Sequence, residues 1–308
     1  MLSYLHTFHA GNHADILKHI TLLYTLEYYN RKDKPYSVFD THSGRALYEL
    51  NGKEALKTGE ASKGIGLLLE KEQSEGEKVP SGLKNYIEFV KKLLENGFYP
   101  GSPCFERYFI KKGCSLFLTE LHKTEFSNLC ENLKHFENFS EVQKDCTVRF
   151  ENKDGFAFLK SSVPPVIKRG LILCDPSYEE KTDYTSASEI LSIVHKKWSG
   201  ASILLWYPLL SNRQEEIENM KQTVLASVKN RDFHTEVLDV QFMVDTSDSH
   251  IETLLKDAIG SEKPRLYGSG MFVVNPCWGL DEHLKNVLPY LSGVLGRDGN
   301  GNYSVQML

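Results

Sequence analysis

The stretch Arg169–Tyr184, RGLILCDPSYEEKTDY, decides the fold that we expect of this 308-residue chain. Its apolar run Leu171–Cys174 is typical of a buried strand in a parallel sheet. The strand ends on Asp175-Pro176-Ser177-Tyr178, which sets a carboxylate, a stiff backbone carbonyl and an aromatic ring side by side. Because open α/β sheets bind ligands beyond the carboxyl ends of their strands, this stretch predicts a ligand site as well as a strand.

Six more strand patterns alternate with helical patterns, which favours an α/β doubly wound fold with a mostly parallel, seven-stranded sheet. One helix is expected between Asn12, as its N-cap, and Pro35. Another is expected to start with Ser102 as N-cap and Pro103 at the first position, and to end at Gly113. The expected strands are residues 36–40, 114–120, 146–154, 171–175, 202–208, 234–243 and 270–276.

Residues 49–99 break this alternation with two helical patterns joined by a polar segment. We therefore expect an inserted helical subdomain at 49–99 within a main domain made of residues 1–48 and 100–308. The composition, with a net charge of −5, argues against a polybasic protein, so any nucleic acid would meet a local basic patch. The basic candidates are Lys18, Arg31, Lys32, Lys34, Lys91 and Lys92.

The six cysteines form no CxxC pair, and we interpret them as reduced thiols. The N-terminus has no signal-peptide pattern, and no apolar run approaches the ~20 residues of a membrane span. These features predict a cytoplasmic protein without a membrane partner.

Acidic residues follow four successive strands: Asp40, Glu120, Asp154 and Asp175. Carboxylates gathered at one edge of a sheet would repel one another unless a cation or a hydroxyl-rich ligand lay among them. An adenosine-bearing cation fits, with Glu120 on the ribose hydroxyls and Asp154 on the adenine amino group. The alternative is that each acid caps the helix that follows its strand.

A nicotinamide cofactor is a second alternative, and it requires a G-x-G-x-x-G turn after the first strand. The first strand is followed by THSGRALY, which has one glycine and no cradle for a pyrophosphate. S-adenosylmethionine has no pyrophosphate and fits the pattern better.

The chemistry that suits Asp175 and Pro176 is methylation of an exocyclic amine on an aromatic base. Such an amine is a poor nucleophile because its lone pair is delocalised into the ring. The Asp175 carboxylate and the Pro176 carbonyl could accept its two hydrogens, and these contacts strengthen as the transition state becomes cationic. Tyr178 would stack on the flipped base. The alternative for the tetrapeptide is an ordinary turn with a capping Asp.

DPSY resembles the [DNS]-P-P-[YFW] motif of amino-methyltransferases. Together with MLSYLHTFHAGNHADILKH, DTHSG, YPGSP, TELH, NKDG, LWYP and GSGMFVVNPCW, it resembles the RlmJ family of bacterial 23S rRNA adenine-N6 methyltransferases over nearly the whole chain. The resemblance implies a class I S-adenosylmethionine-dependent methyltransferase fold with an inserted helical subdomain. It also implies a monomer that acts on a single adenine and an N-terminal tail, residues 1–11, that closes over the cofactor.

The resemblance also implies roles for individual residues. Asp175 would be the catalytic acceptor, and Tyr4 and Lys18 would face the target nucleotide. The residues implied for the S-adenosylmethionine site are His19, His42, Ser102, Glu120, Asp154 and Gly155. A zinc site built from His6, His9, His13 and His19 is an alternative use of the N-terminal histidines, but no tetrahedral ligand set is complete, so no metal is expected.

Three departures from the family pattern leave alternatives open. Ser177 stands where the motif has a second proline, Arg45-Ala46 follow Gly44 where the family is richer in glycine, and the loop at 247–266 is longer than expected. A non-catalytic nucleic-acid-binding factor, for example one used in DNA metabolism, is therefore a second hypothesis. Methylation of an adenine or cytosine in DNA is a third, since both bases carry the same kind of amine.

Overall fold

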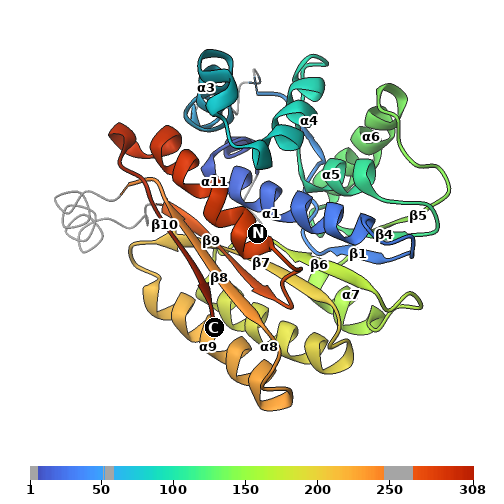
Figure 1. Ribbon diagram of the computed structural model, residues 1–308. Helices are drawn as coiled ribbons and strands as arrows, with labels where there is room; N and C mark the ends of the chain where they lie inside the picture. The colour runs from blue at the N-terminus through green and yellow to red at the C-terminus, as the bar shows by residue number, and fades with distance from the viewer. Residues whose placement is uncertain (1–5, 51, 53–58, 246–265) are drawn as a thin grey trace.

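The computed structural model describes residues 6–50, 52, 59–245 and 266–308. Eight of its strands form one sheet in the order β10-β8-β9-β7-β6-β1-β4-β5 (Figure 1). These strands are β1 (Ser37–Asp40), β4 (Ser115–Thr119), β5 (Thr147–Glu151), β6 (Gly170–Cys174), β7 (Ser202–Leu210), β8 (Val237–Met243), β9 (Leu266–Val274) and β10 (Asn302–Met307).

The sheet contains all seven strands that the sequence predicts. Strands β5, β4, β1, β6 and β7 are parallel, whereas β9 runs antiparallel between β7 and β8. Asp40 lies opposite Leu118 on one side and Leu173 on the other, so the carboxyl ends of β1, β4 and β6 meet at one edge. The eighth strand, β10, pairs antiparallel with β8 and was not predicted, because its half-exposed residues form no apolar run.

Helices cover both faces of the sheet (Figure 1). The alternation of side chains along β1 shows how the layers form: Val38 packs into the core on one side and Phe39 into the core on the other. On the Val38 side lie α1 (His13–Asn30), α5 (Ser102–Phe109), α6 (Lys123–Phe139) and α11 (Leu280–Leu295). On the Phe39 side lie α7 (Gly155–Ser162), α8 (Lys181–Lys197) and α9 (Gln214–Arg231).

The two predicted helix starts have different outcomes. Asn12 caps α1 as expected, since its side chain accepts hydrogen bonds from the backbone N–H groups of Ala14 and Asp15. The prediction that Ser102 is an N-cap is wrong: Ser102 is already the first residue of α5, Gly101 precedes it, and no side chain caps this end. Proline lies in the first turn as predicted, and the helix ends at Phe109, before Gly113.

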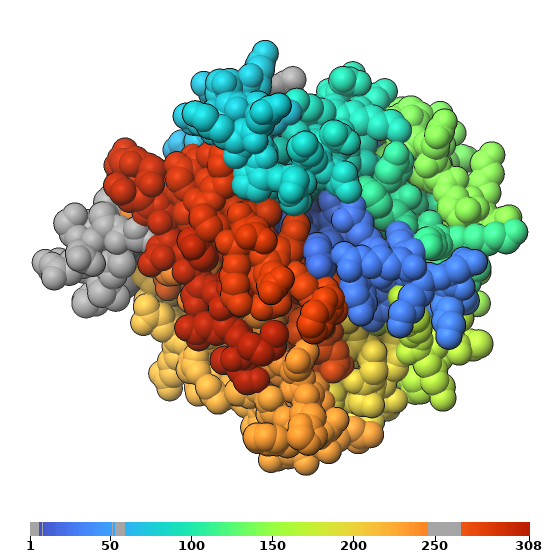
Figure 2. All heavy atoms as spheres, in the orientation of Figure 1, coloured from blue at the N-terminus to red at the C-terminus, as the bar shows by residue number. Residues whose placement is uncertain are grey.

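The segment 49–99 is helical, as predicted. It contains a π-type turn (Ser62–Gly66), α3 (Leu67–Glu75) and α4 (Lys84–Leu94), and its two ends pair through β2 (Leu47–Tyr48) and β3 (Tyr99–Pro100). Tyr86 and Phe89 of α4 pack on the ring of Phe105 in α5. In Figure 2 this segment, in cyan, forms one continuous surface with α1 and α11. The division into two domains therefore stays a prediction, since the insertion shares its core with the main domain.

Some predictions fall outside the described residues. Tyr4 lies outside them with the rest of residues 1–5 of the proposed tail, whereas His6–Phe8 form a 3₁₀ turn. The loop at 247–266 is also outside, apart from Leu266. Among the helices that the structure describes, none combines the length and the apolar character needed to cross a membrane.

Candidate active site

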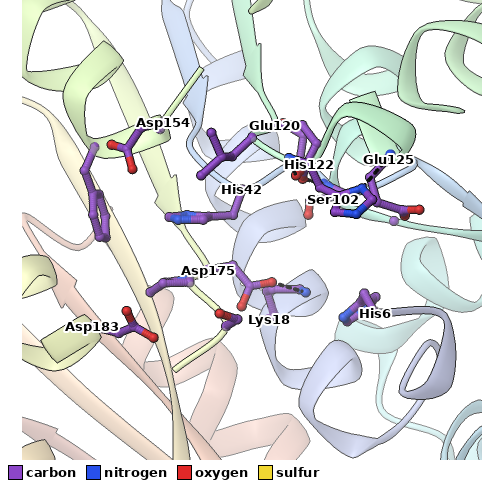
Figure 3. Close-up of a pocket in the computed structure, with 18 of the residues that line it drawn as sticks. His6, Lys18, His42, Ser102, Glu120, His122, Glu125, Asp154, Asp175 and Asp183 are labelled. Atoms are coloured by element: carbon purple, nitrogen blue, oxygen red, sulfur yellow. Dashed lines mark hydrogen bonds and ion pairs between the residues drawn. The ribbon is translucent and has the colours of Figure 1, made fainter. Parts of the chain in front are cut away.

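A cavity of about 280 Å³ lies at the carboxyl ends of β1, β4, β5 and β6 (Figure 3). It is where the sequence predicts a ligand, because parallel strands bring their terminal residues to one edge. Eight of the predicted site residues line it: Lys18, His42, Ser102, Glu120, Asp154, Gly155, Asp175 and Pro176.

Glu120 is held by the backbone rather than by a cation. Its Oε2 accepts a hydrogen bond from the N–H of Gly44 at 2.9 Å, and its Oε1 accepts one from the N–H of His122 at 2.8 Å. Burial raises the pKa of Glu120, although these hydrogen bonds oppose the shift. A carboxylate has about four acceptor sites, so Glu120 can still accept two hydroxyl hydrogens from a ligand.

Asp154 supports both interpretations made from the sequence. Its Oδ1 caps α7 by accepting the N–H of Ala157 at 2.7 Å, yet the residue also lines the cavity. Gly155 follows it, and a Cβ placed there would lie 1.9 Å from the carbonyl oxygen of Thr41. Only glycine lets the start of α7 approach the loop after β1 so closely, and this approach closes one wall of the cavity.

Asp175 lies beside the amino group of Lys18, with Oδ2 2.5 Å from Nζ (Figure 3). Lys18 also pairs with Asp15, 2.9 Å away, and Asp15 in turn pairs with His6 at 3.0 Å. Burial alone would lower the pKa of Lys18, but the two carboxylates outweigh it and raise that pKa well above its usual value. Burial likewise opposes the ionised form of Asp15, yet His6 and Lys18 hold the pKa of Asp15 well below its ordinary value. Asp15, Lys18 and Asp175 therefore form a chain of alternating charge.

Residues 33–308 match the model of the family described as ribosomal RNA large subunit methyltransferase D, RlmJ. The chain is 36% identical to ribosomal RNA large subunit methyltransferase J of Escherichia coli K12, an alignment that covers 100% of this chain and 99% of that protein. The Haemophilus influenzae protein of the same name is 33% identical, with the same coverage. The chain belongs to the RlmJ family.

A crystal structure of a Legionella pneumophila protein superposes on this RlmJ-family chain with a TM-score of 0.77 and 28% identity. The match covers 97% of this chain and 98% of that one, so the two share the whole fold. Together with the family and the sheet order, it establishes the class I S-adenosylmethionine-dependent methyltransferase fold.

Two residues that the sequence analysis places at the site, His19 and Tyr178, do not line the cavity. His19 is fully buried in α1, hydrogen-bonded to the hydroxyl of Tyr99, and burial lowers its pKa to about 3. It does not reach the lining of the cavity. Tyr178 is also buried: its hydroxyl donates to the carbonyl of Trp206 at 2.9 Å, and its ring packs on Tyr184. The expected stacking of Tyr178 on a base is corrected accordingly, since its ring helps to hold β7 in place.

Asp40, the fourth acid at a strand end, lies beneath this cavity and does not line it. Asp40 is fully buried, and burial raises its pKa to about 7. Its Oδ1 accepts the N–H of His42, which orients the loop after β1. The ring of His42 does line the cavity, and its Nδ1 bonds to the hydroxyl of Thr41. Three of the four acids thus reach the ligand edge, and the fourth shapes the loop.

Several residues that line the cavity are not predicted from the sequence. Glu125 forms a two-pronged pair with Arg45, at 2.8 and 2.7 Å, and Asp183 enters from α8. Neither residue belongs to a recognisable motif. Each lies in a helix, Glu125 in α6 and Asp183 in α8, and reaches the cavity only through the packing of that helix. Arg45, one of the departures from the family pattern, therefore has a structural partner: it neutralises Glu125 in the cavity wall.

The acids of the cavity exceed its cations. Within the described residues, Glu125 pairs with Arg45 and Asp175 with Lys18, whereas Glu120, Asp154 and Asp183 have no cationic partner. A cationic ligand with ribose hydroxyls fits this donor set. No cluster of three or more histidine, cysteine or acidic side chains suited to a metal occurs in the described ranges, where His6 and His9 face Asp15 and Glu60.

Proposed function

We propose that this protein transfers the methyl group of S-adenosylmethionine to the exocyclic N6 amine of one adenine in 23S rRNA. Membership of the RlmJ family carries the coarser statement, that the chain is an S-adenosylmethionine-dependent rRNA methyltransferase. The observation that supports the finer one is the position of Asp175, a 14% exposed carboxylate at the end of β6 with one oxygen paired and one available.

The residues of the cavity suit S-adenosylmethionine. Glu120 would accept the ribose hydroxyls and Asp154 the adenine amino group, while Ser102, His42 and Gly155 would line the cofactor. The bound cofactor supplies an electrophilic methyl group on a sulfonium centre. The unpaired acids favour this positive charge in a partly enclosed site, where charge interactions are stronger than in water.

Asp175 and Pro176 would activate the amine. Oδ2 of Asp175 faces Lys18, whereas Oδ1 has no partner among the described residues and can accept one N–H of the amine. The carbonyl of Pro176 would accept the other, which draws the nitrogen lone pair out of conjugation with the ring. The new N–C bond forms as the sulfur–carbon bond breaks, and the amine then releases a proton towards Asp175 or solvent. Both contacts gain strength as the nitrogen becomes cationic.

RNA contacts stay a prediction, and the structure corrects one part of it. Lys18 is buried in its ion pairs and does not belong to a basic surface. Lys91 is partly neutralised by Glu72, 2.5 Å away. Arg31, Lys32 and Lys34 remain exposed cations near the end of α1. A monomer acting in the cytoplasm remains part of the proposal.

The test is methylation of 23S rRNA from a strain that lacks this gene. Wild-type protein should add one N6-methyl group to one adenine, and Asp175→Ala should lose about 10²–10³ of the rate, the effect of removing one preorganised charge-stabilising group. Calorimetry should show that Asp175→Ala still binds S-adenosylmethionine. Transfer by Asp175→Ala at the wild-type rate would rule out the mechanism. A wild-type protein that binds no S-adenosylmethionine would support the non-catalytic hypothesis, and methylation of DNA alone would support the third.

A further inference from the structure

The proposed mechanism leaves two buried carboxyl groups unused: Asp40, at the end of β1, and Glu106, in α5. Both side chains are fully buried. Within the part of the chain that the structure describes, neither oxygen of Glu106 has a hydrogen-bond partner, and Oδ2 of Asp40 has none. The fourth oxygen, Oδ1 of Asp40, accepts the N–H of His42 at 3.1 Å. Buried polar groups without partners are costly and rare, so this arrangement needs an explanation.

Both carboxyl groups lie in the same layer of the molecule. Side chains alternate along β1, so Asp40 lies on the same face as Val38, which packs into the core that contains α1 and α5. Ser102 and Glu106 lie four positions apart in α5 and share one face of that helix. Because Ser102 lines the cavity of the candidate active site, Glu106 lies one turn, ~6 Å, further along the same face. The two carboxyl groups therefore lie beneath the cavity, between the end of β1 and α5.

A single shared proton accounts for the unpartnered oxygens. A fully buried carboxylate with no cation beside it is unstable, so at least one of the two groups carries a proton. Burial raises the pKa of Glu106 well above its ordinary value, and Asp40 raises it further. Burial also raises the pKa of Asp40, to about 7, although the N–H of His42 opposes the shift. A proton held between the two groups, directly or through a buried water molecule, gives both residues a partner.

The charged groups that act on this pair belong to the cavity. The negative charges of Asp175 and Glu120 raise the pKa of Asp40, and the positive charge of Lys18 lowers it. All three of these side chains line the cavity. The other titratable groups near the pair are neutral, because burial lowers the pKa of His42 and raises the pKa values of Tyr36, Cys104 and Cys174. A positive charge added to the cavity must therefore favour the ionised form of the pair.

We infer that Asp40 and Glu106 hold one proton between them and release it to solvent when a cationic ligand enters the cavity, so that the pair distinguishes S-adenosylmethionine from its product. This inference rests on the proposed function for the identity of the ligand. S-adenosylmethionine carries a positive sulfonium group, whereas S-adenosylhomocysteine, which is left after methyl transfer, has a neutral thioether in its place. The ionised pair stabilises the first charge state, and it takes a proton back from solvent once the methyl group has left. Glu106 touches no ligand and acts through Asp40, so it is a positioning residue.

Calorimetry of ligand binding in two buffers with different ionisation enthalpies counts the protons that are released. At pH 7, S-adenosylmethionine should release a fraction of one proton from wild-type protein, and S-adenosylhomocysteine should release less. A ligand that lowers a pKa binds more tightly as the pH rises through that pKa. The preference for S-adenosylmethionine should therefore increase severalfold from pH 6 to pH 8, within a limit of roughly tenfold for two unit charges ~10 Å apart at an effective dielectric constant of ~20.

Glu106→Gln is the variant that tests the pair. Glutamine keeps the shape of the side chain and can donate a hydrogen bond to Asp40, but it has no proton to release. Asp40 should then stay ionised from pH 6 to pH 8, so the proton release and the pH dependence of the preference should both be lost. Glu88→Gln is the matched control, because it removes an exposed carboxyl group of α4 outside the cavity and should match wild type.

A measurement on wild-type protein carries the test should Glu106→Gln not fold. NMR titration of the side-chain carboxyl carbons of Asp40 and Glu106 gives the apparent pKa values of the pair. S-adenosylmethionine should lower the first of them by more than S-adenosylhomocysteine does.

The outcomes separate the two proposals. Equal proton release by both ligands, a titration of the pair that S-adenosylmethionine does not shift, or a pH-dependent preference that persists in folded Glu106→Gln would each overturn this inference alone. A wild-type protein that binds neither ligand would overturn the proposed function and this inference with it.

Discussion

Lys18 is the residue on which the charge balance of the active site depends. It is the cation between two buried or nearly buried carboxylates, Asp15 and Asp175, that lie 160 positions apart in the chain. Its pKa is raised, so its contribution to stability is present at every pH below its ordinary value near ~10.4 and is lost only above it. The pKa of Asp15 is lowered, so its contribution is complete above ~3.9 and is lost as the pH falls through the lowered value. The network is therefore fully formed across the physiological range.

Replacing Lys18 with Met should lower the free energy of unfolding by about 3 kcal/mol, because it leaves two carboxylates without their cation in a buried site. Urea unfolding at pH 7 measures this change. Lys34→Met, at an exposed lysine, is the control and should have little effect. Adding Asp15→Asn to Lys18→Met should cost less than the sum of the two single changes. Additive effects would show that the pair contributes nothing.

The sequence predicts the acids that line the cavity better than the residues that position them. Glu120 and Asp175 are predictable because each directly follows a strand, and Asp154 because it lies three residues after the end of β5. The role of Lys18 as the partner of Asp175 is not, since it depends on how α1 packs on the sheet. The predicted stacking of Tyr178 on a base fails for a similar reason. Whether its ring faces the cavity or the core depends on its backbone conformation, which has a φ of +52°.

At the scale of elements, the approach of α7 to the loop after β1 forms one wall of the cavity at the strand ends. Gly155→Ala should disturb it, because the added Cβ has no room beside the backbone of Thr41. We expect S-adenosylmethionine affinity to fall at least tenfold in calorimetry, with a loss of stability of about 1–3 kcal/mol from overpacking.

The matched control for this prediction is Gly200→Ala, where a Cβ would meet nothing within 4 Å. That variant should bind S-adenosylmethionine as wild type does. Wild-type affinity in Gly155→Ala would mean that α7 can move away without cost, and that the wall does not depend on glycine.

A second element contact joins the N-terminal segment to the insertion. His9 lies 3.0 Å from Glu60, and this hydrogen bond raises the pKa of His9, while the same contact lowers the pKa of Glu60 against the effect of burial. The contribution of His9 is complete below ~6.5 and is lost as the pH rises through its raised pKa. That of Glu60 is complete above ~4.3 and is lost as the pH falls through its lowered pKa. The contact should be strongest between these two limits.

Proton titration of His9 by NMR should give a pKa above that of His9 in the Glu60→Gln variant. Unfolding measured from pH 6 to 8 should show a loss of stability with rising pH in wild type that is smaller in His9→Gln. An unchanged His9 titration in Glu60→Gln would contradict the pairing.

At the scale of the whole molecule, the insertion and the main domain share one core. Tyr86, Val90 and Leu93 of α4 are fully buried in the same apolar cluster as α1 and α5. A helix packed in this way should not unfold by itself. The amides of α4 should therefore exchange with deuterium at a free energy close to that of β1, with a single unfolding transition. Earlier exchange of α4 than of β1 would instead support 49–99 as a separable subdomain.

The architecture as a whole is largely readable from the sequence, since alternating apolar strands and amphipathic helices dictate a parallel sheet. Two features of the sheet are not. Strand β10 is half-exposed along its length and pairs only because β8 offers an edge. The overhang of β7 beyond β6 depends on where β6 ends relative to it, which is a matter of register that no single segment encodes. The cavity lined by Trp206, Pro208 and Leu210 of β7 follows from that register.

The order of the strands has a consequence for biosynthesis. Strand β9 lies between β7 and β8, although both precede it in the chain. A nascent polypeptide that ends before Leu266 would carry every acid of the cofactor edge, yet β7 would lack the neighbour that keeps Trp206 and Leu210 extended. Translation must therefore pass β9 before β7 gains its antiparallel partner, and prematurely terminated products would hold the acid-lined edge of the sheet beside an unpaired β7.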